Sequence, residues 1–405
     1  MSLSQLARSI SESPTLKLNT TAALLREKGE PVIHLGGGEP KSKAPVDAVT
    51  NCTSFLNKRE VRYTPADGIP ALKKAVARYT AEHYHKPVLP ENVIVSGGAK
   101  QAIMVLLHAI LDPKEEVVFP APYWVSYPEM VKLAGGVPVV VTPQDRNFYP
   151  TVKEIAEAVG PHTKAVILNT PNNPSGVMYT QDFIAEIVEF SEKKGLYLIM
   201  DDIYNRLVFG GKTAPICYEF TRTPMEESRL VVINGVSKMY AMTGFRIGWA
   251  IGNRELVQAM TNIQSQQTSG PSAPAQWAAL GALNGDQSCV ESLRQTLENN
   301  CNLMLERLRA FAGIRVIEPD GTFYCFPDFS AYMPDSQKLA QFLLEKVCVV
   351  TVPGKEFGCE GHLRLSYCGS SQEIIEGLQR IEWALDPNAP RELWLGNRKL
   401  VKDWV

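Results

Sequence analysis

Seven short apolar runs constrain the fold of this chain more than any other feature of the sequence does. Most of them are separated by a longer amphipathic segment. Each run has the length and near-continuous hydrophobicity of a strand that is buried on both faces. Residues 100–111 and 180–195, which lie between such runs, repeat apolar side chains at helical spacing. The alternation predicts an α/β fold with a mostly parallel seven-stranded sheet covered by helices. The predicted strands are residues 92–98, 116–121, 137–142, 164–170, 196–202, 229–235 and 247–252.

The chain is expected to form two domains and a short tail. The seven runs lie within residues 44–286, which we predict to be a large domain. Residues 287–385 predict a smaller α+β domain, and residues 1–43, too few to fold alone, are expected to pack on it. Its predicted elements are a helix at 291–311, strands at 314–319, 322–329 and 349–354, and a helix at 373–385. Residues 386–405 are expected to be an extension docked on the surface.

Charge and cysteine content argue against several classes of function. The 405 residues include 41 basic and 43 acidic side chains, so the net charge of −2 predicts no nucleic-acid or anionic-membrane partner. The eight cysteines form no CxxC pair and have no histidine cluster nearby, so no metal site is expected. No apolar run is long enough for a signal peptide or a membrane span. Together with the scattered cysteines, this predicts a cytoplasmic protein.

The segment NGVSKMYAMTGFRIGWAIG favours a phosphate site. Lys238 follows a predicted strand, and Arg246 lies eight residues later between Gly244 and Gly248. The glycines let the backbone approach a bound group, and the guanidinium fork suits a phosphate. Ser237 offers a further hydrogen bond. A lone lysine is usually a surface residue, but the pattern S-K-x5-G-x-R-x-G is far less common by chance.

Two other predicted strands end in polar residues, where the active groups of α/β sheets lie. In LYLIMDDIYNRL the strand ends at Asp201, and Tyr204 follows three residues later. In AVILNTPNNPSG a strand leads into a turn that contains Asn173. Taken alone, Asp201 could equally cap a helix, and the asparagine turn could be only a turn.

Three weaker signals accompany these motifs. Gly97 and Gly98 separate a strand from a helix, where free N–H groups and the helix dipole favour a phosphate. Trp124 could stack on a flat ring, although a lone tryptophan more often packs in a core. Arg364 lies in a short apolar strand of the smaller domain, where a buried guanidinium needs an anionic partner. That partner is either a substrate carboxylate or a structural ion pair.

These motifs occur together in one order, and the combination resembles the fold-type-I enzymes of the class I/II aminotransferase family, which use pyridoxal 5′-phosphate (PLP). It particularly resembles bacterial-type aspartate and aspartate/prephenate aminotransferases, over about residues 14–385. PLP needs a lysine, a carboxylate against the pyridine nitrogen, a phosphate pocket and a clamp for the substrate carboxylate. The resemblance is carried by LGGGEP, RYTPADGIPALKKAV, SGGAKQA, PYWVSYPEM, NTPNNPSG, DDIY, SKMYAMTGFRIGW, TFY and LRLSY.

The resemblance implies a role for each matching residue. Lys238 is expected to attach the cofactor and then to carry a proton, and Asp201 to pair with the pyridine nitrogen. Tyr204 and Asn173 match the groups that bind the ring oxygen. Trp124 matches the stacking aromatic, and together with Asn173 it is expected to border the substrate. The positions that match the phosphate side are Gly98, Ala99, Lys100, Ser237 and Arg246.

The resemblance also implies how the substrate and a second subunit bind. Arg364 is expected to hold the α-carboxylate, with the backbone of Gly38 beside it. Thr15 and Lys100 match positions that bind a distal carboxylate, which favours aspartate, glutamate and their 2-oxo acids. Tyr63 matches a tyrosine that reaches the phosphate of the neighbouring subunit's cofactor, which implies a homodimer with shared active sites.

Departures and alternatives accompany this prediction. Gly235 stands where many relatives carry a phosphate-binding serine, and Lys41 and Lys43 stand where an acidic residue often follows GEP. These lysines either attract anionic substrates or belong to a solvated loop. The expected reaction is ping-pong transamination, but elimination, cyclisation or oxidation on this scaffold starts in the same way, and a prephenate, aromatic or secondary-metabolite substrate stays open. A non-enzymatic ligand-sensing regulator is more remote, because residues 1–43 hold no helix-turn-helix.

Overall fold

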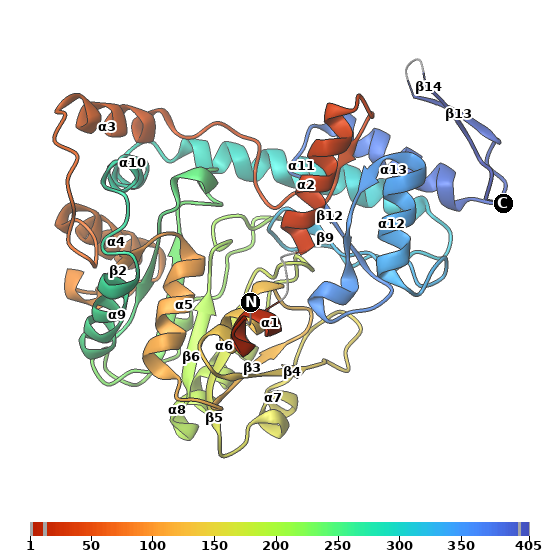
Figure 1. Cartoon of the computed structure of the whole chain (residues 1–405). Coiled ribbons are helices and arrows are strands. Elements are labelled where there is room, and N and C mark those ends of the chain that lie inside the picture. The colour runs from red at the N-terminus through yellow and green to blue at the C-terminus, as the bar shows by residue number, and fades with distance from the viewer. Residues whose placement is uncertain (1–2, 11–13, 396–397, 405) are drawn as a thin grey trace.

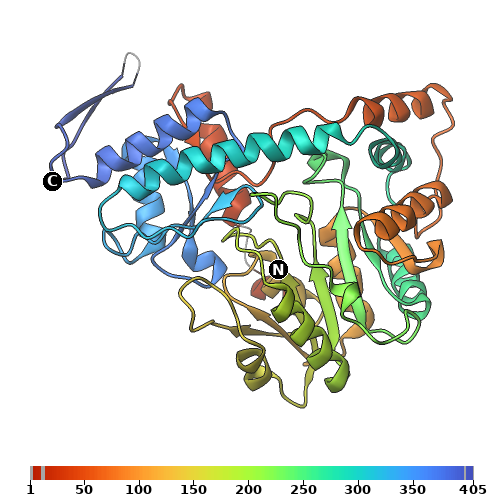
Figure 2. The same cartoon turned by 180° about the vertical axis from the view of Figure 1, so that it is seen from behind.

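The protein consists of a helix-covered central sheet and, beside it, a second group of helices with small sheets (Figures 1 and 2). The structure is a computed structural model and describes residues 3–10, 14–395 and 398–404. The long helix α11 (Ser288–Ala310) leads from the sheet-bearing part toward the C-terminal part. No helix in the described ranges is both long and apolar enough to span a membrane.

The central sheet confirms the predicted α/β fold. Its strand order is β2-β8-β7-β6-β5-β3-β4, and every neighbouring pair is parallel except the two pairs that include β8. Each strand coincides with one of the predicted apolar runs. The strands are β2 (Val93–Ser96), β3 (Glu116–Pro120), β4 (Val137–Val141), β5 (Thr163–Asn169), β6 (Tyr197–Asp201), β7 (Leu230–Gly235) and β8 (Gly248–Ile251).

Helices cover both faces of the sheet, which explains why its strands are apolar without interruption. Along β5, Ile167 packs toward one face while Val166 and Leu168 pack toward the other, with the two-residue period of a strand. The first face is covered by α5 (Ala99–Ile110), α6 (Ser126–Leu133) and α9 (Arg254–Gln267). The second face is covered by α4 (Pro70–His83), α7 (Val152–Ala158), α8 (Gln181–Lys194) and α10 (Ala273–Asn284).

The second part combines helices with two small sheets. Because β1 pairs with β10, the N-terminal segment lies beside the C-terminal third of the chain, and we propose that residues 1–43 and 287–385 form one domain. The other small sheet has the order β11-β12-β9 and is antiparallel. The elements are α2 (Pro14–Glu27), α12 (Ser336–Val347), α13 (Ser371–Leu385), β1 (Ile33–His34), β9 (Tyr324–Cys325), β10 (Val349–Val350), β11 (Val352–Pro353) and β12 (Leu363–Ser366).

Two strand predictions in this part were wrong. Residues 314–319 do not form a strand, and Arg315 makes only an isolated bridge with Asp328. The Arg315 side chain instead donates a hydrogen bond of 2.6 Å to the carbonyl oxygen of Arg146, which ties the segment to a loop of the sheet-bearing part. Residues 349–354 were predicted as one strand but divide between the two small sheets, because β10 pairs with β1 and β11 pairs with β12.

The C-terminal tail forms a hairpin and then returns to α13. The hairpin strands are β13 (Glu392–Leu395) and β14 (Arg398–Val401), and they project from the body (Figure 1). The buried Lys402 ammonium donates hydrogen bonds to the carbonyl oxygens of Trp383 and Asp386, at the end of α13. The Trp404 ring packs edge-on against Trp383. The other described helical segments are α1 (Gln5–Ser9), α3 (Val46–Asn57), and the 3-10 turns η1 (Pro90–Asn92), η2 (Cys217–Glu219), η3 (Thr243–Phe245) and η4 (Gly354–Phe357).

Candidate active site

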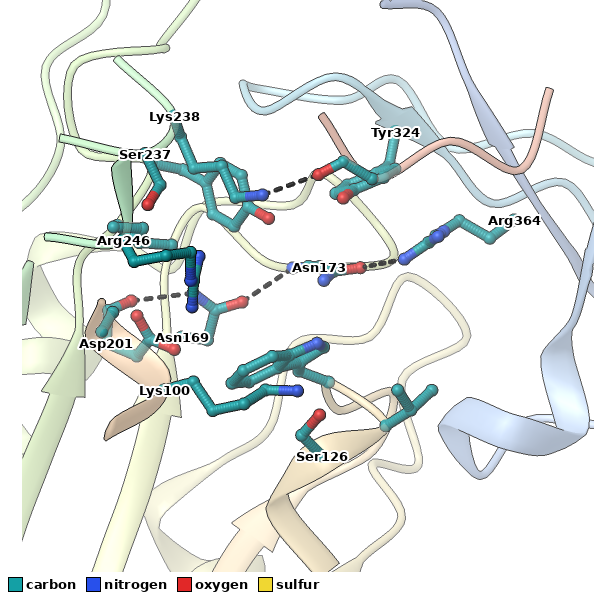
Figure 3. Close-up of a pocket in the computed structure, with 16 residues that line it drawn as sticks. Lys100, Ser126, Asn169, Asn173, Asp201, Ser237, Lys238, Arg246, Tyr324 and Arg364 are labelled. Atoms are coloured by element: carbon teal, nitrogen blue, oxygen red, sulfur yellow. Dashed lines mark hydrogen bonds between the residues drawn. The ribbon is translucent and has the colours of Figure 1, made fainter. Parts of the chain in front are cut away.

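A pocket of about 270 Å³ opens where β5 and β6 end and where the second part of the protein faces the sheet (Figure 3). It lies at the carboxyl ends of parallel strands, where α/β sheets bind their ligands. Most of the predicted site residues, which are far apart in the sequence, meet here. The lining residues are Gly38, Ala99, Lys100, Trp124, Val125, Ser126, Asn169, Asn173, Asp201, Ile203, Tyr204, Ser237, Lys238, Arg246, Tyr324 and Arg364.

Lys238 carries the buried amine of the pocket. Its Nζ donates a hydrogen bond of 2.6 Å to the carbonyl oxygen of Gly38 and lies 5.6 Å from the centre of the Phe323 ring. Burial, and after it the positive charge of Arg364, lowers the pKa of Lys238 to about 8. An amine with a lowered pKa is more often uncharged near neutral pH, so it can attack a carbonyl group and accept a proton.

Asp201 lies at the end of β6 with one carboxylate oxygen free. Oδ2 accepts a hydrogen bond of 2.7 Å from the Tyr127 hydroxyl, whereas the buried Oδ1 has no hydrogen-bond partner among the described residues. Burial raises the pKa of Asp201 to about 6, although the Tyr127 hydrogen bond opposes the shift. A buried carboxylate with a free oxygen is suited to a cationic partner, such as a protonated ring nitrogen.

The start of α5 and the Arg246 side chain form an anion cradle. Gly98 precedes the helix with φ 91° and ψ 162°, a conformation that only glycine adopts readily. A Cβ atom at Gly98 would stand 2.7 Å from a guanidinium nitrogen of Arg246, so the glycine leaves room for this side chain. The first N–H groups of the helix and the guanidinium suit a phosphate dianion, and Ser237 lines the same pocket.

Arg364 points into the pocket from β12 and has only uncharged hydrogen-bond partners in the described chain. Its Nη1 donates to Oδ1 of Asn173 and its Nη2 to the carbonyl oxygen of Gly36, each at 3.0 Å, while the buried Nε has no partner. The guanidinium carbon lies 4.3 Å from the centre of the Tyr324 ring. The structural ion pair that was the alternative for Arg364 is therefore absent from the described residues, which favours a carboxylate ligand.

Aromatic groups and a second lysine complete the pocket. The Lys100 Nζ lies 4.9 Å from the centre of the Trp124 ring, and burial, with Arg246 as the second cause, lowers the pKa of Lys100. The ring of the buried Tyr204 lies edge-on to the Tyr324 ring, with 6.1 Å between the ring centres. Burial raises the pKa of Tyr204 well above its usual value, so this phenol stays neutral and can donate a hydrogen bond.

The family model for class I and II aminotransferases matches residues 30–381. The chain belongs to this family. As a member, it is an aminotransferase, and the family depends on PLP.

The aminotransferase is similar over nearly its whole length to aspartate aminotransferases. It is 38% identical to the aspartate aminotransferase of Geobacillus stearothermophilus, over 96% of this chain and 100% of the relative. It is 37% identical to the aspartate/prephenate aminotransferase of Thermus thermophilus, over 93% of this chain and 97% of the relative. Its fold matches that of the Thermus thermophilus aspartate aminotransferase with maleate, with a TM-score of 0.89 and 36% identity over 94% of this chain and 99% of that chain.

The pocket of this aminotransferase fits PLP on observations of its own. The free oxygen of Asp201 offers a partner for a protonated pyridine nitrogen, and the cradle at Gly98 and Arg246 offers one for the phosphate. Lys238 supplies an amine that lines the same cavity. The lysine, the carboxylate and the phosphate cradle, which would hold the cofactor itself, are therefore present at one cavity.

Among the predicted residues whose side chains the structure describes, two do not line the pocket. Gly98 lies directly beside it, in contact with Arg246. Tyr63 is 96% exposed on the single chain. Thr15 belongs to α2, but its side chain lies outside the described residues.

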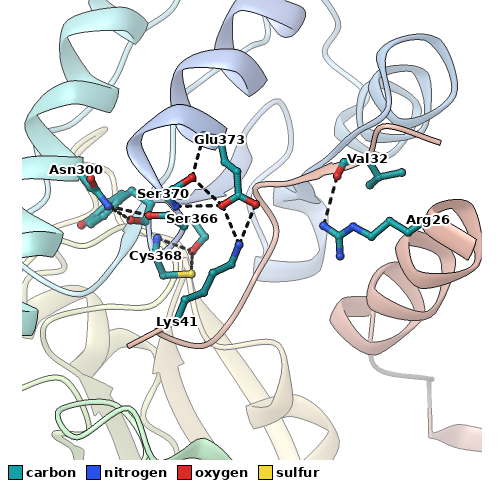
Figure 4. A network of polar contacts seen from close by, with 10 residues as sticks. Arg26, Val32, Lys41, Asn300, Ser366, Cys368, Ser370 and Glu373 are labelled. Atoms are coloured by element: carbon teal, nitrogen blue, oxygen red, sulfur yellow. Dashed lines mark hydrogen bonds and ion pairs between the residues drawn. The ribbon is translucent and has the colours of Figure 1, made fainter. Parts of the chain in front are cut away.

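Lys41 makes an ion pair that the sequence did not predict. Its Nζ lies 2.9 Å from Oε2 of Glu373, at the start of α13 (Figure 4). Glu373 also accepts a hydrogen bond from the N–H of Ser370. Both members of the pair are partly exposed, so the pair contributes little to stability. The Glu373 carboxylate does, however, balance the positive charge of Lys41. This lysine was expected either to attract anionic substrates or to belong to a solvated loop.

Sequence reasoning missed several residues of the pocket region, three of which contact its functional groups. Tyr127 holds Asp201, Tyr324 lies against Arg364, and Asn169 bonds to both Asp201 and Asn173. All three are part of motifs that were recognised, PYWVSYPEM, TFY and AVILNTPNNPSG. Within those motifs nothing local distinguishes a tyrosine or asparagine that binds a neighbour from one that only fills the core.

Proposed function

We propose that this protein is a PLP-dependent aminotransferase that moves an amino group from a dicarboxylic L-amino acid, aspartate or glutamate, to a 2-oxo acid. The observation that carries the proposal is one cavity that holds a buried amine, a buried carboxylate with a free oxygen, and a buried guanidinium without a carboxylate partner among the described residues. These groups are Lys238, Asp201 and Arg364. The similarity to aspartate aminotransferases supports the dicarboxylic substrate.

The residues that would hold the cofactor surround these three groups. Lys238 would attach the cofactor, and Asp201 would pair with the pyridine nitrogen. The phosphate would lie against the start of α5 and Arg246, with Ser237 beside it. The ring would stack on Trp124. The oxygen on the ring would accept hydrogen bonds from Tyr204 and Asn173.

The chain's own groups account for binding and proton transfer. When bound, PLP supplies an electron sink for the pair of electrons released at the substrate's α-carbon. Arg364 binds the α-carboxylate and orients this carbon toward Lys238. The Lys238 amine accepts the α-proton at Nζ. It then delivers this proton to the atom that lies on the other side of the transferred nitrogen. Asp201, which is shielded from water, keeps the ring nitrogen protonated.

Lys100 is our candidate for the distal carboxylate of the substrate. Its side chain lines the pocket and rests on Trp124, so its charge is presented toward the cavity. Lys100→Ala is expected to raise the KM for aspartate much more than the KM for an uncharged amino acid. An equal loss of activity for both substrates would exclude Lys100 from substrate recognition.

We further propose a homodimer with shared active sites. Exposed apolar side chains cluster in one segment that includes α3 and ends at Tyr63, and a solvent-exposed surface of this kind is typical of an interface. They are Val46, Val49, Leu56, Val61 and Tyr63. Sedimentation of the purified protein tests the dimer. Restored activity on mixing Tyr63→Ala with Lys238→Ala subunits would support sharing, because one hybrid site then has both groups.

The first experiment on function is an absorbance spectrum of the purified protein with added PLP, before and after single amino acids are supplied without a 2-oxo acid. Loss of the band of the lysine-bound cofactor and appearance of the amine form with L-aspartate or L-glutamate would support transamination and identify the donor. A persistent band with release of ammonia would instead indicate elimination or oxidation. No band with the parent protein would remove Lys238 from its role, and Lys238→Ala serves as the control without a band.

A further inference from the structure

Asn169, the last residue of β5, joins the two halves of the pocket through its side-chain amide. Its Nδ2 donates a hydrogen bond of 2.7 Å to the backbone oxygen of Asp201, and its Oδ1 accepts one of 2.8 Å from the backbone N–H of Asn173. Oδ1 of Asn173 then accepts the 3.0 Å hydrogen bond from Arg364. Figure 3 shows these contacts as an unbroken series from the end of β6 to the guanidinium.

The geometry requires an amide at this position. Asn169 and Asp201 are direct partners in the parallel pairing of β5 with β6, so the short side chain reaches the neighbouring strand end. A primary amide donates and accepts at the same time, whereas a carboxylate only accepts. Asn169 is 4% exposed, so loss of either hydrogen bond would leave a buried polar group without a partner.

The side chain of Asn169 lines the pocket, yet its donor and its acceptor each already have a protein partner. Its influence on a ligand must therefore pass through Asp201 on the cofactor side and through Asn173 and Arg364 on the substrate side. Because the other hydrogen bond of Arg364 in the described chain goes to the carbonyl oxygen of Gly36, Asn173 is its only side-chain hydrogen-bond partner there.

We propose that Asn169 is a positioning residue that couples Asp201 to the Asn173–Arg364 pair, so that the cofactor side and the carboxylate clamp keep one fixed geometry. The inference rests on the proposed function, because it assigns the two sides of the pocket to cofactor and substrate. It adds to that function a residue, Asn169, that contacts neither the cofactor nor the substrate. Asn169 instead links Asp201, on the cofactor side, to Asn173 and Arg364, on the substrate side.

Asn172 provides a matched control in the same turn. It is buried to the same degree, at 3% exposure, and its amide is equally occupied. Its Nδ2 donates to the carbonyl oxygen of Pro122 at 3.1 Å, and its Oδ1 accepts from the N–H and the hydroxyl of Ser175. These contacts hold the turn together without reaching Asp201 or Arg364. A purely structural role for Asn169 predicts that the two asparagines behave alike.

The experiment compares Asn169→Ala and Asn172→Ala as PLP-loaded enzymes. The first readout is the pKa of the lysine-bound cofactor, taken from the change of its absorbance band with pH. The second is the Kd of succinate, a dicarboxylic acid that cannot react. For Asn169→Ala we expect the band pKa to move by about half a unit and the succinate Kd to rise about tenfold. For Asn172→Ala we expect both values to stay at the parent's, at an equal or larger loss in thermal stability.

Equal changes in the two variants, or no change in either, would overturn the coupling. If Asn169→Ala does not fold, Asn169→Asp takes its place, since it keeps the size and the acceptor but replaces the donor, and the same two shifts are expected. The parent protein separates this outcome from the proposed function. A parent without the cofactor band refutes the proposed function, whereas a normal parent band with an unchanged Asn169 variant refutes only the positioning role.

Discussion

Replacement of Asp201 by asparagine should stabilise the cofactor-free protein relative to the parent, and this difference should grow as the pH rises. Burial raises the pKa of Asp201 from 3.8 to about 6, so the folded state disfavours the carboxylate relative to the unfolded state. Below pH 3.8 the carboxyl is protonated in both states and contributes nothing. Above pH 6 it is ionised in both, and the folded state carries the full cost of burying the charge.

The size of this effect follows from the shift in pKa. A shift of about two units corresponds to about 3 kcal/mol, of which about 0.5 kcal/mol is present at pH 4 and nearly all at pH 8. The amide of Asp201→Asn does not titrate and still accepts the Tyr127 hydrogen bond through its oxygen. The difference in unfolding free energy between variant and parent should therefore grow by about 2.5 kcal/mol from pH 4 to pH 8 in favour of the variant.

Denaturant unfolding of both cofactor-free proteins at several pH values, at one protein concentration, measures this difference. Any constant effect of the substitution cancels, because only the change with pH is compared. Asp286→Asn is the control, since this exposed carboxyl has a lowered pKa and should not show the same rise. If the difference in unfolding free energy between Asp201→Asn and the parent stays constant or falls as the pH rises, the claim that the buried Asp201 charge destabilises the folded protein is refuted.

Three further predictions concern other parts of the molecule. Gly98→Ala should weaken PLP binding, measured by fluorescence titration, far more than Gly97→Ala, because only Gly98 has a positive φ and only its added Cβ would meet the Arg246 guanidinium. Tyr324→Phe should leave the KM for the amino donor unchanged but shift the pKa of the cofactor band, since it keeps the ring at Arg364 and removes a hydroxyl that acts electrostatically on the Tyr204 phenol. Lys402→Met should lower the unfolding free energy by about 1–3 kcal/mol in denaturant without changing KM, because two carbonyls at the end of α13 lose their donor.

Local pattern alone was enough for the large sheet, and it indicated several residues that the structure brings together in one pocket. Six of the seven strands are apolar runs whose side chains alternate between two helix-covered faces, so their burial follows from the residues themselves, whereas the edge strand β4 is partly exposed. The ends of such strands meet at one edge of the sheet, which brings Asn173, Asp201 and Lys238 together although they are far apart in the chain. Family resemblance added the remaining roles.

What the amino-acid sequence by itself determined, then, was the class of fold, the family and the residue types of the pocket. Only the tertiary structure decided which partners these residues have. It paired Lys41 with Glu373, gave Arg364 uncharged partners, divided residues 349–354 between two sheets, and placed Asn169 between Asp201 and Asn173. The physical reason is that hydrophobic burial is a property of each short segment, whereas a hydrogen bond or ion pair between distant residues depends on how whole elements pack.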